Sequence, residues 1–396
     1  FLIPFAIFLL PILLGLFFGF CTLIIGPYLK SNLNSLTLFV VAFSLIDYFR
    51  GKMFTGFPWN LWAYSWSWFE EVLQVLNPIG LYAFNLLSIS VFSLPAIFFF
   101  NRKKNHYAIF IAGLTIFFSN YIYGSFQINN NNKTNSLSIS NSSYQTVKII
   151  SPNFELKYDL KSDEIIKNID RLIKISSPEE DKKTIFIWPE GAFSGYNFQE
   201  IQSLKYNFSK NFSKNHLIIL GINTNKKDTD NYFNSFIMVN NKFEILYKYN
   251  KRKLVPFGEF LPFEEKLKKL GFKNITRGYN SFSPGKKIEP LIVDSLKILP
   301  SICYEIIFPE LIQEIKTTNL IVNLSEDAWF GKSIGPHQHF SKAIFRAIEN
   351  NSYLARSTNK GISAFINNKG QIIKFLNPNE SGNIELKVPT VHSEQK

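Results

Sequence analysis

The stretch Ile-Leu-Pro-Ser-Ile-Cys-Tyr-Glu at residues 298–305 is a short apolar run that stops at a thiol and a carboxylate. From Tyr144 onward, similar runs rich in β-branched residues alternate with amphipathic segments that carry Lys and Glu. This alternation indicates an α/β fold rather than an all-β fold. Apolar residues at helical spacing predict a helix over 161–174. The predicted strands are 147–150, 184–188, 217–220, 233–239, 243–249, 298–303, 320–324, 362–366 and 372–375.

Two other predicted strands also lead into reactive side chains. The run 185–188 leads into Glu190, and the run 245–249 leads into Lys251. Because α/β sheets place their sites at the carboxyl ends of strands, these two residues and Cys303 are candidates for one site. Each also has a structural interpretation, since a lone Cys that ends an apolar strand is commonly a core residue, and Glu190 or Lys251 could simply lie on the surface.

The three side chains have complementary chemistry. A thiol with a pKa of ~8.5 is mostly protonated at neutral pH, so a nucleophilic Cys303 needs a nearby cation or base. Glu190 could take the thiol proton and return it to a leaving group if burial raises its pKa. Lys251 could hold the thiolate and then stabilise an oxyanion, together with the backbone N–H that follows Cys303.

The first 125 residues have a different composition. They hold nine Lys, Arg, Asp and Glu residues, whereas the whole chain of 396 residues has 43 Lys+Arg and 30 Asp+Glu. So few charges cannot cover a soluble surface, which predicts a membrane-embedded domain. The chain's 41 Phe and 17 Tyr residues exclude intrinsic disorder. The Lys residues are scattered among acidic ones, which disfavours nucleic-acid binding, and two distant cysteines disfavour a disulfide framework.

Four apolar runs are candidate membrane crossings, and Asp47 makes the second run the least certain. The basic cluster at 101–106 is expected on the cytoplasmic side, so the chain after residue 125 would lie outside. Arg50 and Lys52 would then also lie outside, against that rule. The Trp-rich stretch 54–68 either anchors the chain at the interface or shapes a surface for lipid access. The four runs are 1–27, 36–49, 78–100 and 107–124.

These patterns divide the chain into four parts. We expect a transmembrane helical domain at 1–125, a polar linker at 126–143, an α/β domain at 144–390 and a short tail at 391–396. The chain begins at Phe1 rather than Met, and no apolar run follows Leu386. Both features predict that the sequence is a shortened form, with the membrane domain incomplete at its N-terminus.

Five sequence blocks carry a resemblance to a known family. The blocks are Trp188-Pro189-Glu190, Tyr249-Asn250-Lys251 with Leu254–Glu259, Ile302–Glu305, Asn323–Gly331 with Ser333–Phe340, and Arg356–Gly361. In order and spacing they resemble the carbon–nitrogen hydrolase (nitrilase) superfamily and, within it, the apolipoprotein N-acyltransferases. The match covers about 144–390, and the stretch 54–60 is similar to the membrane part of the same family.

The resemblance implies an α-helical membrane domain followed by an α-β-β-α sandwich of the nitrilase type. It implies that Glu190 is the general base, Lys251 the stabilising cation and Cys303 the nucleophile. The supporting active-site residues that it implies are Glu259, which helps to position the lysine, Glu305, which the acyltransferase needs, and Tyr304. The candidate substrate contacts are Tyr158, which stands where the family has Trp, and Trp329 and Phe330, each either core or the wall of an acyl pocket.

The activity implied by the resemblance is lipoprotein maturation in a bacterial inner membrane. A phospholipid would donate a fatty acyl chain to Cys303, and the diacylglyceryl-modified cysteine of an apolipoprotein would accept it. The multi-pass chain would hold its catalytic domain on the periplasmic side, and no metal or organic cofactor is implied. We also expect Cys303 to lie in a partly shielded cleft, since a free thiol outside the cytoplasm is open to oxidation.

Two other functions fit parts of the same pattern. A membrane-tethered amidase or nitrilase would use the same Glu, Lys and Cys but pass the acyl group to water. A non-catalytic membrane scaffold would keep the three residues by coincidence. His337 and His339 could bind a metal from one face of a strand, but no partner at ligand spacing accompanies them, so packing or hydrogen bonding is favoured. Arg356 and Asn359 are predicted to brace loops.

Overall fold

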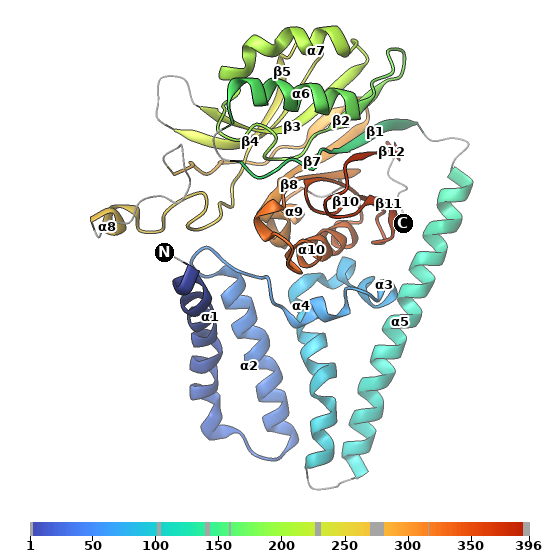
Figure 1. Ribbon diagram of the computed structural model, residues 1–396. Helices are drawn as coiled ribbons and strands as arrows, with labels where there is room; N and C mark the ends of the chain where they lie inside the picture. Colours follow the sequence, from blue (N-terminus) through green and yellow to red (C-terminus); the bar gives the residue numbers. More distant parts are fainter. Residues whose placement is uncertain are drawn as a thin grey trace. The chain divides into compact units, whose positions relative to one another are not determined.

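Figure 1 shows the chain as a computed structural model that describes residues 3–100, 104–138, 143–157, 160–225, 231–269, 281–315 and 317–390. The chain divides into two compact units, residues 1–133 and 134–396. The first unit is helical and the second contains all the described strands.

The first unit confirms the four predicted membrane spans as helices long and apolar enough to cross a bilayer. Large apolar side chains such as those of Leu16, Leu23, Ile116 and Ile122 are exposed on them, as expected for surfaces that face lipid. Pro11 lies inside the first helix, and the third bends at Gly80, whose φ is 75°. The main helices are α1 (Ile3–Ile25), α2 (Leu33–Lys52), α4 (Leu76–Ser93) and α5 (Lys104–Ser138).

A buried ion pair explains how α2 accommodates Asp47. Arg50 Nη2 lies 2.7 Å from Asp47 Oδ1, one turn along the same helix, and both side chains are buried. The side-chain amide of Asn85 on α4 donates to the other oxygen of Asp47 at 2.9 Å. Arg50 also donates to the carbonyls of Phe57 and Asn60, at 3.1 and 3.2 Å. The pair therefore joins α2 to α4 and holds the loop that follows α2.

That loop contains the Trp-rich stretch and the short helices η2 (Trp62–Trp66) and α3 (Glu70–Leu73). Trp66 stacks on Phe92 with ring centroids 5.0 Å apart, and its indole N–H donates to Ser88 at 3.1 Å. Phe54 and Trp68 are exposed. One part of the stretch is thus fastened to α4, while its two ends present aromatic surface, which is compatible with both predicted roles.

Most of the segment predicted as a polar linker, 126–143, is helical. Helix α5 continues through the Asn-rich segment to Ser138, and residues 139–142 lie outside the described residues. A helix needs only its own backbone hydrogen bonds, and residues 126–138 contain no Pro or Gly to interrupt them. The polar residues of this segment therefore give no apolar pattern from which a helix could be predicted, although they can still form one.

The second unit contains two six-stranded sheets, and the predicted nitrilase-type sandwich is confirmed. The first sheet has the order β12-β1-β2-β3-β4-β5 and the second β11-β10-β9-β8-β7-β6. The strands of the first sheet are β1 (Tyr144–Ser151), β2 (Thr184–Ile187), β3 (His216–Asn225), β4 (Tyr232–Val239), β5 (Ile245–Asn250) and β12 (Gly382–Pro389). Those of the second are β6 (Leu291–Val293), β7 (Leu296–Ile302), β8 (Leu320–Glu326), β9 (Tyr353–Asn359), β10 (Ser363–Ile366) and β11 (Ile372–Leu376).

Two apolar clusters hold these layers together. One joins the facing sheets through residues such as Ile187, Ile302 and Val322, and the other packs α6 and α7 on the opposite face of the first sheet around Trp188. The central strands β1, β2 and β3 are parallel, as are β7, β8 and β9, so their carboxyl ends align. The described helices are α6 (Ser162–Ser176), α7 (Lys205–Asn211), α8 (Glu264–Lys269), α9 (Pro309–Gln313) and α10 (Gly335–Glu349), with η4 (Glu200–Leu204), η5 (Cys303–Ile307) and η6 (Ala328–Phe330).

Three strands were not predicted. β6 has only three residues, which is too short for a periodic signal. β9 ends in Arg356-Ser357-Thr358-Asn359, a polar sequence whose side chains are nevertheless buried. β12 carries the alternating apolar residues Ile384, Leu386 and Val388, which pack into the core between the sheets. That alternation was a readable strand signal.

Candidate active site

Three strand ends bring the predicted reactive residues together. Glu190 follows β2, Lys251 follows β5, and Cys303 follows β7 in the facing sheet. Lys251 Nζ lies 4.0 Å from Glu190 Oε1. The pKa of the Cys303 thiol is raised by the charge of Glu190 and lowered by that of Lys251. The carboxylate, the ammonium and the thiol therefore occupy one site.

Glu190 is positioned by hydrogen bonds from two other strands. The amide of Asn234 on β4 donates to Oε1 at 2.6 Å, and the backbone N–H of Glu326 at the end of β8 donates to Oε2 at 3.1 Å. Burial raises the pKa of Glu190, against the attraction of Lys251. Gly221 allows β3 to lie close to the backbone of Glu190, since a Cβ at position 221 would lie 2.9 Å from the Glu190 Cα.

Lys251 is a fully buried cation held between two carboxylates. Its Nζ donates to Glu259 Oε1 at 2.9 Å, and the side chain is 1% exposed. Burial alone would lower the pKa of Lys251, but the charges of Glu259 and Glu190 raise it above its usual value. Glu259 is held in turn by the Val255 N–H at 2.8 Å and by the amide of Asn234 at 2.8 Å. Lys251 therefore stays charged, and Glu259 positions it.

Cys303 sits at a strained turn from β7 into η5. Its φ is 46°, a left-handed conformation that costs a non-glycine residue about 1–2 kcal/mol. The residue as a whole is partly buried. Burial and the charge of Glu190 raise its pKa well above the usual thiol range, although Lys251 opposes them. The resting group is therefore a thiol, which needs a base to become a nucleophile.

Glu305 is a buried brace for this turn. Its Oε2 accepts the N–H of Ile302 at 2.9 Å, while Oε1 accepts the Tyr249 hydroxyl at 2.7 Å and the Arg252 N–H at 2.7 Å. Burial raises the pKa of Glu305. The carboxylate thus ties the turn that begins at Cys303 to the residues on both sides of Lys251.

The remaining predicted site residues have varied surroundings. Tyr304 is partly buried and packs edge-on against Phe308, with ring centroids 5.1 Å apart. Trp329 is 58% exposed, so the core interpretation is wrong for this residue. Phe330 is partly buried, with its ring centroid 5.6 Å from that of His339. Tyr158 lies outside the described residues.

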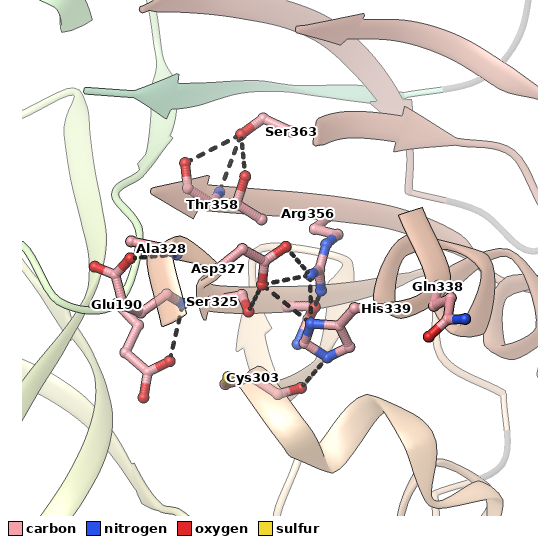
Figure 2. A network of polar contacts seen from close by, with 12 residues as sticks. Glu190, Cys303, Ser325, Asp327, Ala328, Gln338, His339, Arg356, Thr358 and Ser363 are labelled. Atoms are coloured by element: carbon pink, nitrogen blue, oxygen red, sulfur yellow. Dashed lines mark hydrogen bonds and ion pairs between the residues drawn. The ribbon is translucent and has the colours of Figure 1, made fainter. Parts of the chain in front are cut away.

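A second polar network lies behind Cys303, as Figure 2 shows. Arg356 on β9 donates to both oxygens of Asp327 at 2.9 and 3.1 Å, and the Ser325 hydroxyl donates to Asp327 at 2.7 Å. His339 lies between this pair and the nucleophile, with Nδ1 3.0 Å from Asp327 Oδ1 and Nε2 3.2 Å from the Cys303 carbonyl oxygen. Arg356 holds the pKa of Asp327 well below its usual range, despite burial.

The sequence identified some members of this network and missed others. The predicted bracing role of Asn359 is confirmed, because its amide donates to both oxygens of Glu326 at 3.1 and 2.9 Å. His339 is hydrogen-bonded as predicted, but from α10 rather than from a strand. Asp327 directly follows β8, so the strand-end rule could have found it. Asn234 has no local signal, because its contacts depend on strand pairing.

The two histidines do not form part of a larger ligand set. Among the residues that the structure describes, no group of three or more His, Cys, Asp and Glu side chains could hold a metal ion. The chemistry on offer is that of the side chains themselves. A buried carboxylate, a permanent cation and a thiol can form and resolve a covalent acyl intermediate, with either water or an amine as acceptor.

Two family descriptions match the sequence. Residues 155–392 match the carbon–nitrogen hydrolase family, and residues 1–94 match the apolipoprotein N-acyltransferase N-terminal domain. The chain is 33% identical to an apolipoprotein N-acyltransferase of Rickettsia prowazekii (strain Madrid E), over 99% of this chain and 79% of the relative. It is 30% identical to one of Rhizobium etli (strain CIAT 652), over 98% of this chain and 74% of the relative.

Solved structures of the nitrilase superfamily are also similar. A mutant of the Nesterenkonia AN1 amidase is 15% identical, with a TM-score of 0.45 over 63% of this chain and 92% of that chain. Saccharomyces cerevisiae Nit3 is 18% identical, with a TM-score of 0.43 over 62% of this chain and 90% of that chain.

Proposed function

Because the chain belongs to the apolipoprotein N-acyltransferase family within the carbon–nitrogen hydrolases, we propose that it moves a fatty acyl chain from a phospholipid, through a thioester on Cys303, to an apolipoprotein. The acceptor is the α-amine of the diacylglyceryl-modified cysteine at the N-terminus of that apolipoprotein. The observation that carries the proposal is the buried Lys251 ammonium, 4.0 Å from Glu190 Oε1 and next to the Cys303 thiol.

In the first half-reaction, the Cys303 sulfur attacks the ester carbonyl of the phospholipid. Glu190 takes the thiol proton as the carbon–sulfur bond forms, and its raised pKa makes it a stronger base than an exposed carboxylate. Lys251 and the Tyr304 N–H stabilise the oxyanion. The ester carbon–oxygen bond then breaks, Glu190 returns the proton to the leaving oxygen, and lysophospholipid departs.

In the second half-reaction, the neutral α-amine attacks the thioester carbonyl. The carbon–nitrogen bond forms, Glu190 accepts a proton from the amine, and Lys251 again stabilises the oxyanion. The carbon–sulfur bond then breaks, and the thiolate recovers its proton from Glu190. A thioester is already an activated acyl group, so this step draws on the same three side chains.

We also propose that these events take place at the periplasmic face of a bacterial inner membrane. Both substrates carry acyl chains that hold them in a bilayer, and four helices of this chain are long and apolar enough to span one. The basic segment at 101–106 favours a cytoplasmic loop before α5, which would direct the catalytic unit outward.

Intact-mass analysis tests the proposal directly. The purified full chain is incubated with phosphatidylethanolamine vesicles, and a mass increase of one acyl group is expected on the wild-type protein but not on the Cys303→Ala variant. Adding a diacylglyceryl-cysteine peptide should remove the adduct and acylate the peptide. Hydrolysis of a small amide with no adduct from phospholipid would instead support a tethered amidase and overturn the transferase.

A further inference from the structure

His339 is a buried imidazole that contacts the backbone of the nucleophile. It lies on α10 and is 1% exposed. Figure 2 shows the ring between the Cys303 carbonyl on one side and Asp327 and Arg356 on the other. These contacts join His339 to the backbone of the nucleophile and to the side chains of Asp327 and Arg356.

The partners of the ring determine where its proton lies. A carbonyl oxygen can only accept, so the 3.2 Å contact to Cys303 requires a proton on Nε2. Nδ1 faces an acceptor, Asp327 Oδ1, and a donor, Arg356 Nη2, each at 3.0 Å. The neutral ring protonated at Nε2 provides the donor that the Cys303 carbonyl needs. Burial and the charge of Arg356 also lower the pKa of His339.

The carbonyl that His339 contacts belongs to the peptide unit that follows the nucleophile. Cys303 has a φ of 46°, so its conformation needs support from the surrounding structure. A trans peptide unit is planar, with its C=O and N–H pointing in opposite directions. Fixing the Cys303 carbonyl therefore also fixes the direction of the Tyr304 N–H, one of the two proposed oxyanion donors.

We propose that His339 is a positioning residue for acyl transfer, which holds the Cys303–Tyr304 peptide unit in its reactive orientation while Asp327 and Arg356 hold the imidazole. This inference rests on the proposed function of Cys303 as the acylated nucleophile. What the site requires at position 339 is a neutral donor at the place of Nε2, and a charged or proton-transferring group is not required.

Two substitutions test whether the hydrogen-bond donor at the place of Nε2 is needed rather than the imidazole ring as such. In His339→Gln the amide nitrogen can reach the place of Nε2, whereas in His339→Asn it reaches only the place of Nδ1 and leaves the Cys303 carbonyl without its side-chain donor. His337→Asn is the matched control, because His337 is exposed on the same helix. The full chain in detergent or nanodiscs is mixed with phosphatidylethanolamine, and the rate of the Cys303 acyl adduct is followed by quenched intact-mass analysis.

We expect His339→Asn to slow the adduct about 100-fold, as for a misplacement of reacting groups by about 1 Å. His339→Gln should stay within about tenfold of the wild type, and His337→Asn should match it. Alkylation of Cys303 by iodoacetamide, which forms no oxyanion, should fall much less in His339→Asn. That difference distinguishes positioning from a general loss of structure.

Three results would overturn the inference. One is an unchanged acylation rate in His339→Asn, and another is an equal loss of alkylation and acylation. The third is a 100-fold loss in a folded His339→Gln, which also decides the matter if His339→Asn does not fold. Absence of the adduct in the wild type is a different failure, because it would refute the proposed function of Cys303 itself.

Discussion

Each unit of the molecule contains a buried aspartate–arginine pair, and the two pairs perform different tasks. Asp47 and Arg50 are one turn apart on a membrane helix, with their closest atoms 2.7 Å apart. Asp327 directly follows β8 and Arg356 lies within the neighbouring strand β9, with their closest atoms 2.9 Å apart. In both pairs the charged groups are almost fully removed from water. This loss of hydration destabilises the fold unless hydrogen bonds and the ion pair itself compensate for it.

The difference lies in what each pair holds. Arg50 donates onward to the carbonyls of Phe57 and Asn60, so the first pair fixes a loop. The second pair holds His339, which contacts the carbonyl of Cys303 and so acts on the nucleophile. The same two residue types therefore serve as a structural tether in one unit and as a support for reactivity in the other.

The largest effect on the acylation rate is expected from Lys251, another buried cation. We propose that Lys251 acts directly on the reacting atoms. Losing one oxyanion donor costs about 10²–10³-fold. Lys251→Met would also leave Glu190 and Glu259 facing each other without a cation, so we expect the acylation rate to fall at least about 10³-fold. Quenched intact-mass analysis of the Cys303 adduct measures it. The control is Lys248→Met, an exposed lysine on β5, and a loss of similar size there would refute the assignment.

The two pairs themselves are compared by removing one partner or both. Arg50→Met and Arg356→Met each leave a buried aspartate without its cation, which should destabilise the protein by about 3–5 kcal/mol. Combining each with neutralisation of its partner, Asp47→Asn or Asp327→Asn, should recover much of that stability, because no buried charge then remains unpaired. Thermal denaturation in the same detergent measures all four variants.

Acylation rates then distinguish the tasks of the two pairs. The double variant in α2 leaves the support of Cys303 intact, so its folded fraction should acylate within about tenfold of the wild-type rate. The double variant at Asp327 and Arg356 removes the guanidinium and the carboxylate charge that hold the His339 Nδ1 and should acylate about 100-fold more slowly. Equal rates in the two double variants would show that the pairs do not differ in the way proposed.

The sequence predicted the reactive centre better than its supports, for a physical reason. Strand ends can be read from local composition, and that rule brought Glu190, Lys251 and Cys303 to one site. A support depends on pairing between distant segments, which no local pattern records. Asp47 made its helix the least certain span because its charge was read without Arg50, three residues later. The polar residues at the end of β9 hid a strand because their partners are buried carboxylates and backbone groups.

The smallest predicted effect is a pH dependence of stability that comes from His339, which the second pair holds and which has no counterpart at the first pair. Burial and Arg356 keep the pKa of His339 below its ordinary value of 6.5, although Asp327 opposes them. As the pH falls below about 6.5, the unfolded chain binds a proton at this residue and the folded chain does not, so folding stability decreases. The raised pKa values of Glu190, Glu305 and Glu326 act in the opposite direction.

The wild-type curve alone therefore does not isolate His339, but a difference between two curves does. The melting temperature is measured from pH 7.5 down to about pH 5 for the wild type, His339→Gln and His337→Gln. His339→Gln should lose less stability over this interval than the wild type, because its side chain binds no proton in either state. His337→Gln should follow the wild type, since its imidazole is exposed. Parallel curves for the wild type and His339→Gln would mean that the folded protein protonates His339 as readily as the unfolded chain, contrary to the lowered pKa that burial and Arg356 give this residue.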